Sequence, residues 1–290
     1  MEKEVWPTTA EEADALALSI ERLISGGNGR PALVHDGGIW LIALPTTVDL
    51  NVVQRVPAPG NGSDGETFTE AAKRADTKAG VDIVINGMTY SLDSNLHMQG
   101  SRRDTAGGAH GRALQDGVVI GGQPLRATTA RYHLVQHSRA GGLTSSDWKL
   151  GQGDWSSGTG LTGVMAILAG GQPIGSPGGR TNADADKLVR LPEKAGMPYV
   201  GVDRGRELIW IVVKNWGDSQ NAASTRVADI RQVFSWLGVE DVAALDGGDS
   251  VCLVVDGLVL VSPSPYKDRS IPFGLRFTWK SAGQSSKGPQ

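Results

Sequence analysis

The strongest chemical signal in the sequence is the run LDGGDS at positions 245–250. Two carboxylates, Asp246 and Asp249, stand on either side of a glycine pair that lets the backbone turn sharply and approach a ligand closely. Close carboxylates push their pKa values apart, so that one can serve as an acid and the other as a base. The N–H groups of Gly247 and Gly248 suit a phosphate oxygen, and Ser250 is a further candidate for substrate binding. A plain β-turn with solvated aspartates fits the same spacing equally well.

Two other strand ends carry polar or glycine residues. Asn86 closes the apolar run 81–86 and is followed by a glycine, which makes it the third candidate catalytic residue. Gly170 and Gly171 follow another apolar run and are candidate substrate-binding residues. Each position taken singly is typical of a structural turn. Because all of them stand where an apolar strand gives way to a glycine-rich loop, we expect the fold to gather them with Asp246 on one rim.

A further substrate-binding candidate is Lys214, which ends a predicted strand and begins the run KNW at 214–216. We expect this run to reach the same pocket as the LDGGDS segment. Trp216 is suited to stack on a sugar face, although a tryptophan in the core is the more common case.

The rest of the sequence predicts the elements that must position these residues. Apolar residues at helical spacing predict helices over 8–25, 67–79 and 224–237, and capping boxes at Thr8 and Thr67 mark the first two starts. Apolar runs between glycine-rich turns predict strands at 32–44 (a hairpin), 48–53, 81–86, 164–168, 199–203, 207–214, 242–245, 251–255, 258–261 and 273–279. We therefore expect an α+β fold: a mixed or antiparallel sheet with helices packed on one face and long Gly-rich loops on the other.

Length and composition predict one folded domain with short extensions. A chain of 290 residues that includes 40 glycines can bury a sizeable core between many turns. Its single cysteine, Cys252, lies in an apolar run and is expected to be a core residue. We predict a helical extension over residues 1–30, a single domain over 31–280 and a disordered tail over 281–290.

Charge and motif content narrow the class of protein. A net charge of -3 argues against binding to a nucleic acid duplex, but a local cluster of donors would suffice for a small anionic substrate. The sequence has neither the roughly 18-residue apolar run of a membrane span nor the apolar segment of a secretory signal. We therefore expect a cytoplasmic or phage-associated protein, and the oligomeric state stays open. No zinc-ligand spacing is present, so we predict no cofactor, although clustered aspartates also suit a divalent cation.

The chain resembles the phosphodiester glycosidase family in the order and spacing of several segments. These are NGMTY at 86–90, GGQP at 170–173, paired strands at 199–203 and 207–213, and a helix at 224–238 followed by DVAALDGGDS at 241–250. The last of them is similar to the family signature L-G-[AV]-x-[DN]-A-[LM]-x-L-D-G-G-[GD]-S and is the most specific. The resemblance extends over residues 31–277.

The resemblance implies hydrolysis of the bond between the anomeric carbon of a sugar and a phosphodiester or nucleotide-type leaving group. The expected partner is a small-molecule glycosyl phosphodiester or a glycan. Asp246 would be the nucleophile, the base or a stabiliser of positive charge on the sugar, with Asp249 as its partner. Asn86 would hold a sugar hydroxyl or a phosphate oxygen. Family members commonly have Arg-Thr where this chain has Met197 and Pro198, and an arginine there would bind phosphate.

Two other functions fit the sequence. One is a catalytically inactive carbohydrate-binding or virion-associated module, which should leave Asp246 and Asp249 apart from Asn86. The other is a metal-assisted phosphodiester or nucleotide-sugar hydrolase, which should lose activity in a chelator. A glycosidase should instead release reducing sugar without a metal requirement.

Overall fold

The computed structural model describes residues 6–26, 29–55, 65–74, 80–87, 111–122, 125, 131–137, 147–175, 179–180, 182, 185, 188, 195–216, 225–268 and 271–280. Its helices are α1 (Ala10–Gly26), α2 (Phe68–Lys73), α5 (Val227–Trp236) and α6 (Pro265–Asp268), together with the 3-10 turn η4 (Gly248–Ser250). Its strands are β1 (Ala32–Asp36), β2 (Ile39–Pro45), β3 (Asp49–Gln54), β4 (Gly80–Asn86), β5 (Arg112–Gln115), β6 (Val118–Gly122), β7 (Tyr132–Gln136), β8 (Trp148–Gln152), β9 (Thr159–Ala169), β10 (Gln172–Pro173), β11 (Met197–Asp203), β12 (Leu208–Lys214), β13 (Asp241–Ala244), β14 (Leu253–Val255), β15 (Leu258–Val261) and β16 (Phe273–Lys280).

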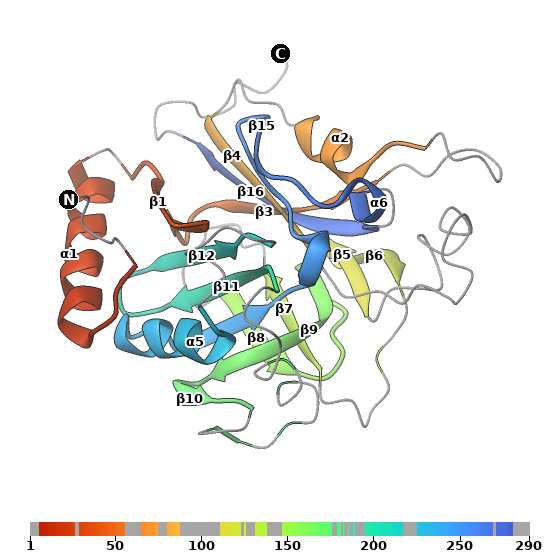
Figure 1. Ribbon diagram of the computed structural model, residues 1–290. Helices are drawn as coiled ribbons and strands as arrows, with labels where there is room; N and C mark the ends of the chain where they lie inside the picture. Colours follow the sequence, from red (N-terminus) through yellow and green to blue (C-terminus); the bar gives the residue numbers. More distant parts are fainter. Residues whose placement is uncertain are drawn as a thin grey trace, which may run out of the picture.

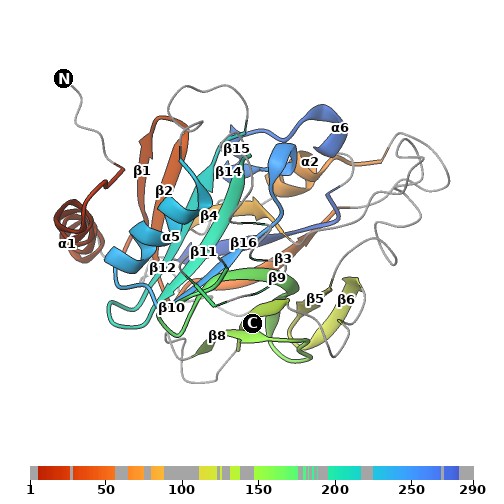
Figure 2. The ribbon, with the colours of Figure 1, turned by 60° about the horizontal axis from the view of Figure 1, so that its bottom comes forward.

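The strands form two sheets (Figures 1 and 2). In the larger sheet the order is β1-β2-β12-β11-β13-β9-β5-β6, with β7 and β10 also paired to β9 and β8 paired to β7. In the smaller sheet the order is β15-β14-β4-β16-β3. Every ladder between these strands is antiparallel, and the parallel contact within the described residues is a lone bridge between Ile174 and Arg180. The α+β class is thus confirmed in a mostly β form, and the expected mixed sheet is two antiparallel sheets.

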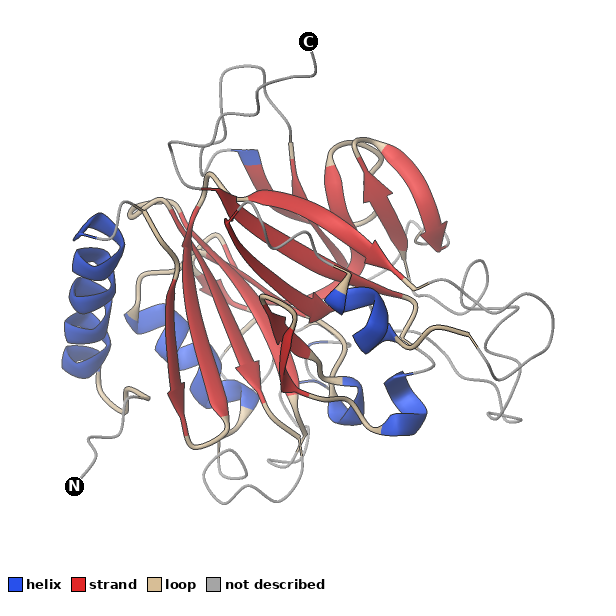
Figure 3. Ribbon diagram, turned by 90° about the horizontal axis from the view of Figure 1, so that it is seen from above, coloured by secondary structure: helices blue, strands red, loops and turns tan. Residues whose placement is uncertain are grey.

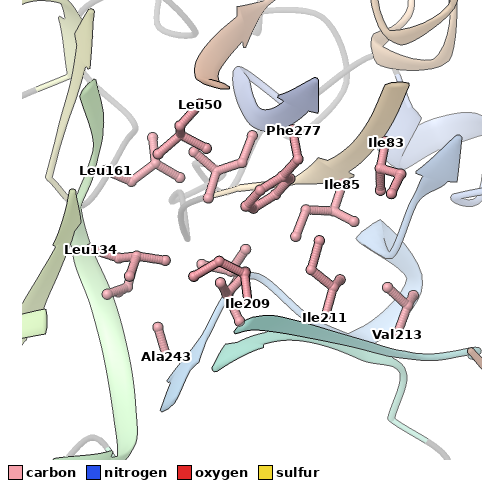
Figure 4. Close-up of a cluster of buried hydrophobic side chains, with 14 of the residues drawn as sticks. Leu50, Ile83, Ile85, Leu134, Leu161, Ile209, Ile211, Val213, Ala243 and Phe277 are labelled. Atoms are coloured by element: carbon pink, nitrogen blue, oxygen red, sulfur yellow. The ribbon is translucent and has the colours of Figure 1, made fainter. Parts of the chain in front are cut away.

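The two sheets pack face to face around the main hydrophobic core. Successive side chains of a strand point to opposite faces, and β12 shows this clearly. Its odd-numbered residues from Ile209 to Val213 point into the core between the sheets, and its even-numbered residues from Leu208 to Val212 belong to the core on the other face. Figure 4 shows Ile209 and Ile211 opposite Ile85 and Phe277 of the smaller sheet. Because both faces of these strands are buried, their sequences are almost continuously apolar.

Helices cover the outer faces of both sheets (Figures 1 and 3). α1 and α5 pack on the larger sheet, where buried α1 residues such as Ala17 and Ile20 share a core with Phe234 of α5. α2 packs on the smaller sheet, where Phe68 shares a core with Val84. The helices therefore lie on two outer faces, whereas the sequence predicts one. The N-terminal helix, predicted as an extension, contributes to a core of the domain.

Most predicted elements exist close to their predicted ends. The capping box of Thr67 and Glu70 starts α2, which ends at Lys73, earlier than predicted. α1 begins at Ala10, two residues later than predicted, and the Glu12 N–H donates to the hydroxyl of Thr9 in place of a capping box at Thr8. The long loops predicted at 87–112 and 174–196 fall largely outside the described residues, as does the tail 281–290. No described helix is long and apolar enough to cross a membrane.

The two sheets are joined where β13 of the larger sheet leads through the LDGGDS segment into β14 of the smaller one. Asn86, at the end of β4, is fully buried beneath this connection. Its Nδ2 donates to the backbone carbonyl of Asp246 at 2.8 Å, and its Oδ1 accepts from the backbone N–H of Cys252 at 2.9 Å. The Asp246 N–H in turn donates to the carbonyl of Gly87 at 2.8 Å. One side-chain amide therefore fixes both ends of the connection against the smaller sheet.

Replacing Asn86 by leucine removes both side-chain hydrogen bonds and leaves two buried backbone groups without partners. We expect Asn86→Leu to lower the free energy of unfolding by about 2–6 kcal/mol, since each of the two buried unpaired groups costs about 1–3 kcal/mol. Urea unfolding followed by tryptophan fluorescence measures this loss. Asn51→Leu, on the partly exposed strand β3, is the matched control and should cost less than about 1 kcal/mol. Equal urea midpoints for the two variants would contradict the role given to Asn86.

Candidate functional site

The candidate site lies at one end of the larger sheet, where β11 begins and β12 and β13 end. Met197 of β11 pairs with Lys214 of β12, and the Leu245 N–H donates to the carbonyl of Pro198. The LDGGDS segment leaves the sheet at this end and turns through η4 towards the smaller sheet. The site is therefore built at the junction between the two sheets.

The two glycines of the segment are required by its backbone path. Gly248 has a φ of +75°, a conformation that side chains with a Cβ rarely adopt. A Cβ on Gly247 would collide with the Met197 side chain and lie 2.7 Å from the carbonyl oxygen of Gly196. The Gly248 N–H donates to that same carbonyl at 2.8 Å. This N–H, a candidate phosphate donor from the sequence, is thus occupied by the protein.

Asp246 is held at the base of the loop in a position that disfavours its charge. The Ser250 side chain and the Gly247 N–H donate hydrogen bonds to its carboxylate. Both residues were predicted to bind substrate, and here they bind Asp246. Burial raises the pKa of Asp246 to about 7, and nearby Asp249 adds to the rise, although the hydrogen bonds and the charge of Lys267 act in the opposite direction. A carboxyl with such a pKa can exchange a proton near neutral pH, which an ordinary surface aspartate cannot.

Asp249 lies higher in the loop, with its side chain 43% exposed. The Ser264 hydroxyl donates to its Oδ2 at 3.0 Å, and the Lys267 Nζ lies 4.0 Å from its Oδ1. The Ser264 N–H also donates to the Asp249 backbone carbonyl at 2.8 Å. The segment before α6 and α6 itself therefore cover one side of the loop and bring a positive charge to it.

Asn86 joins this cluster from below, as described above, so the structure brings it together with Asp246. Its amide contacts backbone atoms of the loop, and its side chain is fully buried. These contacts make Asn86 a positioning residue for Asp246. The contact with a sugar hydroxyl or phosphate oxygen stays a prediction.

Gly170 and Gly171 do not join the cluster. They form the turn between β9 and β10, where the Gly170 N–H donates to Asp241 Oδ1 at 2.8 Å and the Gly171 N–H donates to the carbonyl of Glu240. Asp241 is the first residue of β13, whereas Asp246 follows the end of this strand. At the rise of an extended strand the two residues are about 16 Å apart. The glycine turn lies at the beginning of β13 and the LDGGDS loop at its end, because β9 runs antiparallel to β13.

Lys214 lies at the same end of the larger sheet as the candidate site, but its side chain is on the opposite face of that sheet. Its side chain is buried, and its Nζ donates to the carbonyl of Thr225 at 2.5 Å, just before α5. It follows Leu208, Trp210 and Val212 on the face of β12 that packs towards the helices. The ammonium group is thus directed to the start of α5, on the helix-covered face, and its predicted contact with substrate has no support in this geometry.

Trp216 lies beside the loop, two residues beyond β12. Its indole N–H donates to the carbonyl of Ser262 at 2.8 Å, and its Cβ packs so closely on Gly196 that a Cβ there would lie 2.8 Å away. The same Gly196 Cβ would lie 3.0 Å from the carbonyl oxygen of Gly248. Trp216 as a residue is partly exposed and also packs against the main core.

Sequence reasoning did not identify Ser264 and Lys267 as parts of the site. The pair Ser264-Pro265 is a typical helix start, a capping hydroxyl followed by proline, and the Lys267 N–H donates to Ser264 Oγ at 3.3 Å. That signal predicts the short helix α6. It does not predict that α6 lies against the LDGGDS loop, because this contact is formed only in the folded chain.

Cys252 has the core position that the sequence predicts. Cys252 is buried, and burial raises the pKa of its thiol to about 12, in agreement with a core role. Among the described residues no group of three His, Cys, Asp or Glu side chains is placed to hold a metal ion.

The model of the phosphodiester glycosidase family matches residues 79–278. No curated protein matches the chain. Among solved structures, the catalytic domain of zebrafish N-acetylglucosamine-1-phosphodiester alpha-N-acetylglucosaminidase, auto-inhibited by its pro-peptide, has 12% sequence identity and a TM-score of 0.50, covering 87% of this chain and 82% of that one.

Two further structures are less similar. A hypothetical protein from Synechocystis has 14% identity and a TM-score of 0.43 over 86% of this chain and 61% of that chain. A putative exported protein from Burkholderia pseudomallei has 14% identity and a TM-score of 0.45 over 92% of this chain and 81% of that chain.

The family match includes more than half of the chain and contains Asn86, the whole LDGGDS loop and Lys267. This chain belongs to the phosphodiester glycosidase family.

Proposed function

We propose that the protein hydrolyses the bond between the anomeric carbon of a sugar and a phosphodiester, with Asp246 as the general base. The observation that carries this proposal is the desolvated carboxyl of Asp246, held by Ser250 and the Gly247 N–H inside the segment that matches the family. A base is most effective when its pKa lies near the working pH.

The chemistry of the leaving group supports a base in this position over an acid. A phosphodiester oxygen leaves as a stable phosphomonoester anion and needs little help from a proton donor. The demanding step is the attack of water on the anomeric carbon. In that step the water oxygen bonds to the carbon, the bond from this carbon to the phosphate oxygen breaks with its electron pair, and Asp246 accepts the proton of water.

Trp216 is suited to bind the sugar ring in this reaction. It is partly exposed beside Gly248 and is fixed through its indole N–H, so its ring is presented in one orientation. Indole faces pack well on the apolar face of a sugar. Asp249, exposed at the loop surface, is positioned to accept hydrogen bonds from sugar hydroxyls.

The direct test is a product screen against glycosyl phosphodiesters and nucleotide sugars, with Asp246→Asn as the matched inactive variant. We expect free reducing sugar and a phosphomonoester from the wild type, in the presence of chelator, and at least about 100-fold less from the variant. Loss of activity in chelator with recovery in a divalent ion would support the metal-assisted alternative. Sugar binding without turnover would support the inactive module.

The pH dependence of turnover follows from the raised pKa of Asp246. A base must be deprotonated, so we expect kcat/KM to rise about tenfold per pH unit below 7 and to level off above it. The pH–rate profile on the substrate found in the screen checks this. Asp49→Asn, which changes an exposed carboxylate on β3, should leave the profile unchanged. A profile that falls as pH rises through 7 would make Asp246 an acid and contradict the proposal.

The same pKa shift predicts a stability effect that needs no substrate. In the unfolded chain Asp246 loses its proton near pH 4, whereas in the folded chain it keeps the proton to about pH 7. The folded state therefore binds the extra proton, and this group lowers stability by about 1.4 kcal/mol for each pH unit between those values. Asp246→Asn removes the effect, so its free energy of unfolding should improve relative to wild type as pH rises from 4 to 8. Urea unfolding at several pH values measures the difference, and a constant difference would refute the raised pKa.

A further inference from the structure

The short helix α6, which carries Lys267, is anchored beside the LDGGDS loop. The hydroxyl of Ser264, which caps α6, donates to Asp249 Oδ2, and α6 packs against η4. At the other end of α6, Asp268 Oδ1 accepts from the N–H and hydroxyl of Thr69 at 2.7 and 2.9 Å. α6 is therefore connected both to the loop and to α2 of the smaller sheet, although it has only four residues.

This anchoring places the ammonium of Lys267 within range of both carboxylates of the loop. Its Nζ lies 4.0 Å from Asp249 Oδ1, and its charge acts on Asp246. The lysine side chain is 25% exposed. An ion pair as accessible as this adds little to stability, typically less than about 1 kcal/mol. Stability alone therefore gives a weak reason for a lysine at this position.

A glycosyl phosphodiester supplies a stronger reason. Its phosphate carries a negative charge next to the bond that breaks, and it must approach a loop that already holds two carboxyl groups. Without a cation, the electrostatic repulsion between substrate and loop would oppose binding. Two nearby positions do not supply this cation. Met197 is apolar and buried, and the Lys214 ammonium donates to the Thr225 carbonyl on the helix-covered face.

We propose that Lys267 is the residue that binds the phosphate of the substrate and so determines the specificity for phosphodiester leaving groups. This inference rests on the proposed function for its substrate, but phosphate binding by itself does not need turnover. The flexible lysine side chain reaches from α6 over Asp249, and an ammonium group binds phosphate oxygens as a point charge. Charge on the leaving group is then stabilised as the bond from the anomeric carbon to oxygen breaks.

The test compares Lys267→Gln, Lys267→Arg and the control Lys280→Gln in two measurements. Lys280 lies at the opposite end of β16, paired with Asp49, about 20 Å along the strand from the residue that pairs with Asn86. The first measurement is the Kd for inorganic phosphate by calorimetry, at constant ionic strength. The second is kcat/KM for a glycosyl phosphodiester and for the p-nitrophenyl glycoside of the same sugar.

We expect Lys267→Gln to weaken phosphate binding at least tenfold, and Lys267→Arg and Lys280→Gln to bind as the wild type does. On the plateau of the pH–rate profile, where Asp246 is deprotonated in every variant, we also expect Lys267→Gln to lower kcat/KM for the phosphodiester by about 10–100-fold while turnover of the neutral aryl glycoside changes less than threefold. Because Lys267 also lowers the pKa of Asp246, the pH–rate profile of Lys267→Gln should move to higher pH.

The outcomes separate this inference from the proposed function. A wild type that does not bind phosphate, or a Lys267→Gln variant that binds it unchanged, overturns the role of Lys267. Equal loss on the phosphodiester and the aryl glycoside also overturns it, because Lys267 would then act through Asp246 alone. A wild type that binds phosphate through Lys267 but cleaves no glycosyl phosphodiester refutes the proposed function and leaves the phosphate site standing.

Discussion

The amide of Asn86 is the interaction on which the architecture of this site depends. It bonds to the backbone on both sides of the LDGGDS loop, at the point where the chain passes from one sheet to the other. The loop is also held by the carbonyl of Gly87, directly after β4, by Gly196 beside β11 and by the segment before α6. A polar group buried in this way is costly unless both its donor and acceptor are satisfied, and here each has a backbone partner. The LDGGDS loop is thus fixed between two sheets that share the main hydrophobic core.

That rigidity permits the unfavourable environment of Asp246. A flexible loop would expose the carboxyl to water and return its pKa to the ordinary range. Here the hydrogen bonds from Ser250 and the Gly247 N–H, and the close approach of Gly247 to Met197, hold the carboxyl in its place in the loop. A carboxyl whose pKa is raised by burial lowers the stability of the folded chain, and the large hydrophobic core between the sheets offsets this cost. The cation on α6 then reduces the repulsion without being part of the loop itself.

Local sequence signals predicted the elements well, because those signals act over a few residues. The capping box of Thr67 and Glu70 and the apolar run before Asp246 are examples. The LDGGDS turn was also predictable, because its sharp backbone path needs glycine at positions 247 and 248. The grouping of strand ends was only partly predictable. Asn86 and Asp246 meet because β14 returns antiparallel to β4, whereas Gly170 is at the far edge because β9 runs antiparallel to β13. The sequence shows that a strand ends, but not at which edge, and it does not show that α6 would carry Lys267 to the loop.

The burial of Cys252 gives this junction a built-in reporter. Cys252 is the single cysteine of the chain, and its N–H is bonded to the Asn86 amide directly after the loop. Its thiol is fully enclosed in the small core under α2. A thiol reagent can reach it only when α2, β14 or the loop separates from the core, so the labelling rate follows the frequency of local opening. The single cysteine of the chain therefore allows local opening at this junction to be timed by thiol labelling, without adding a probe.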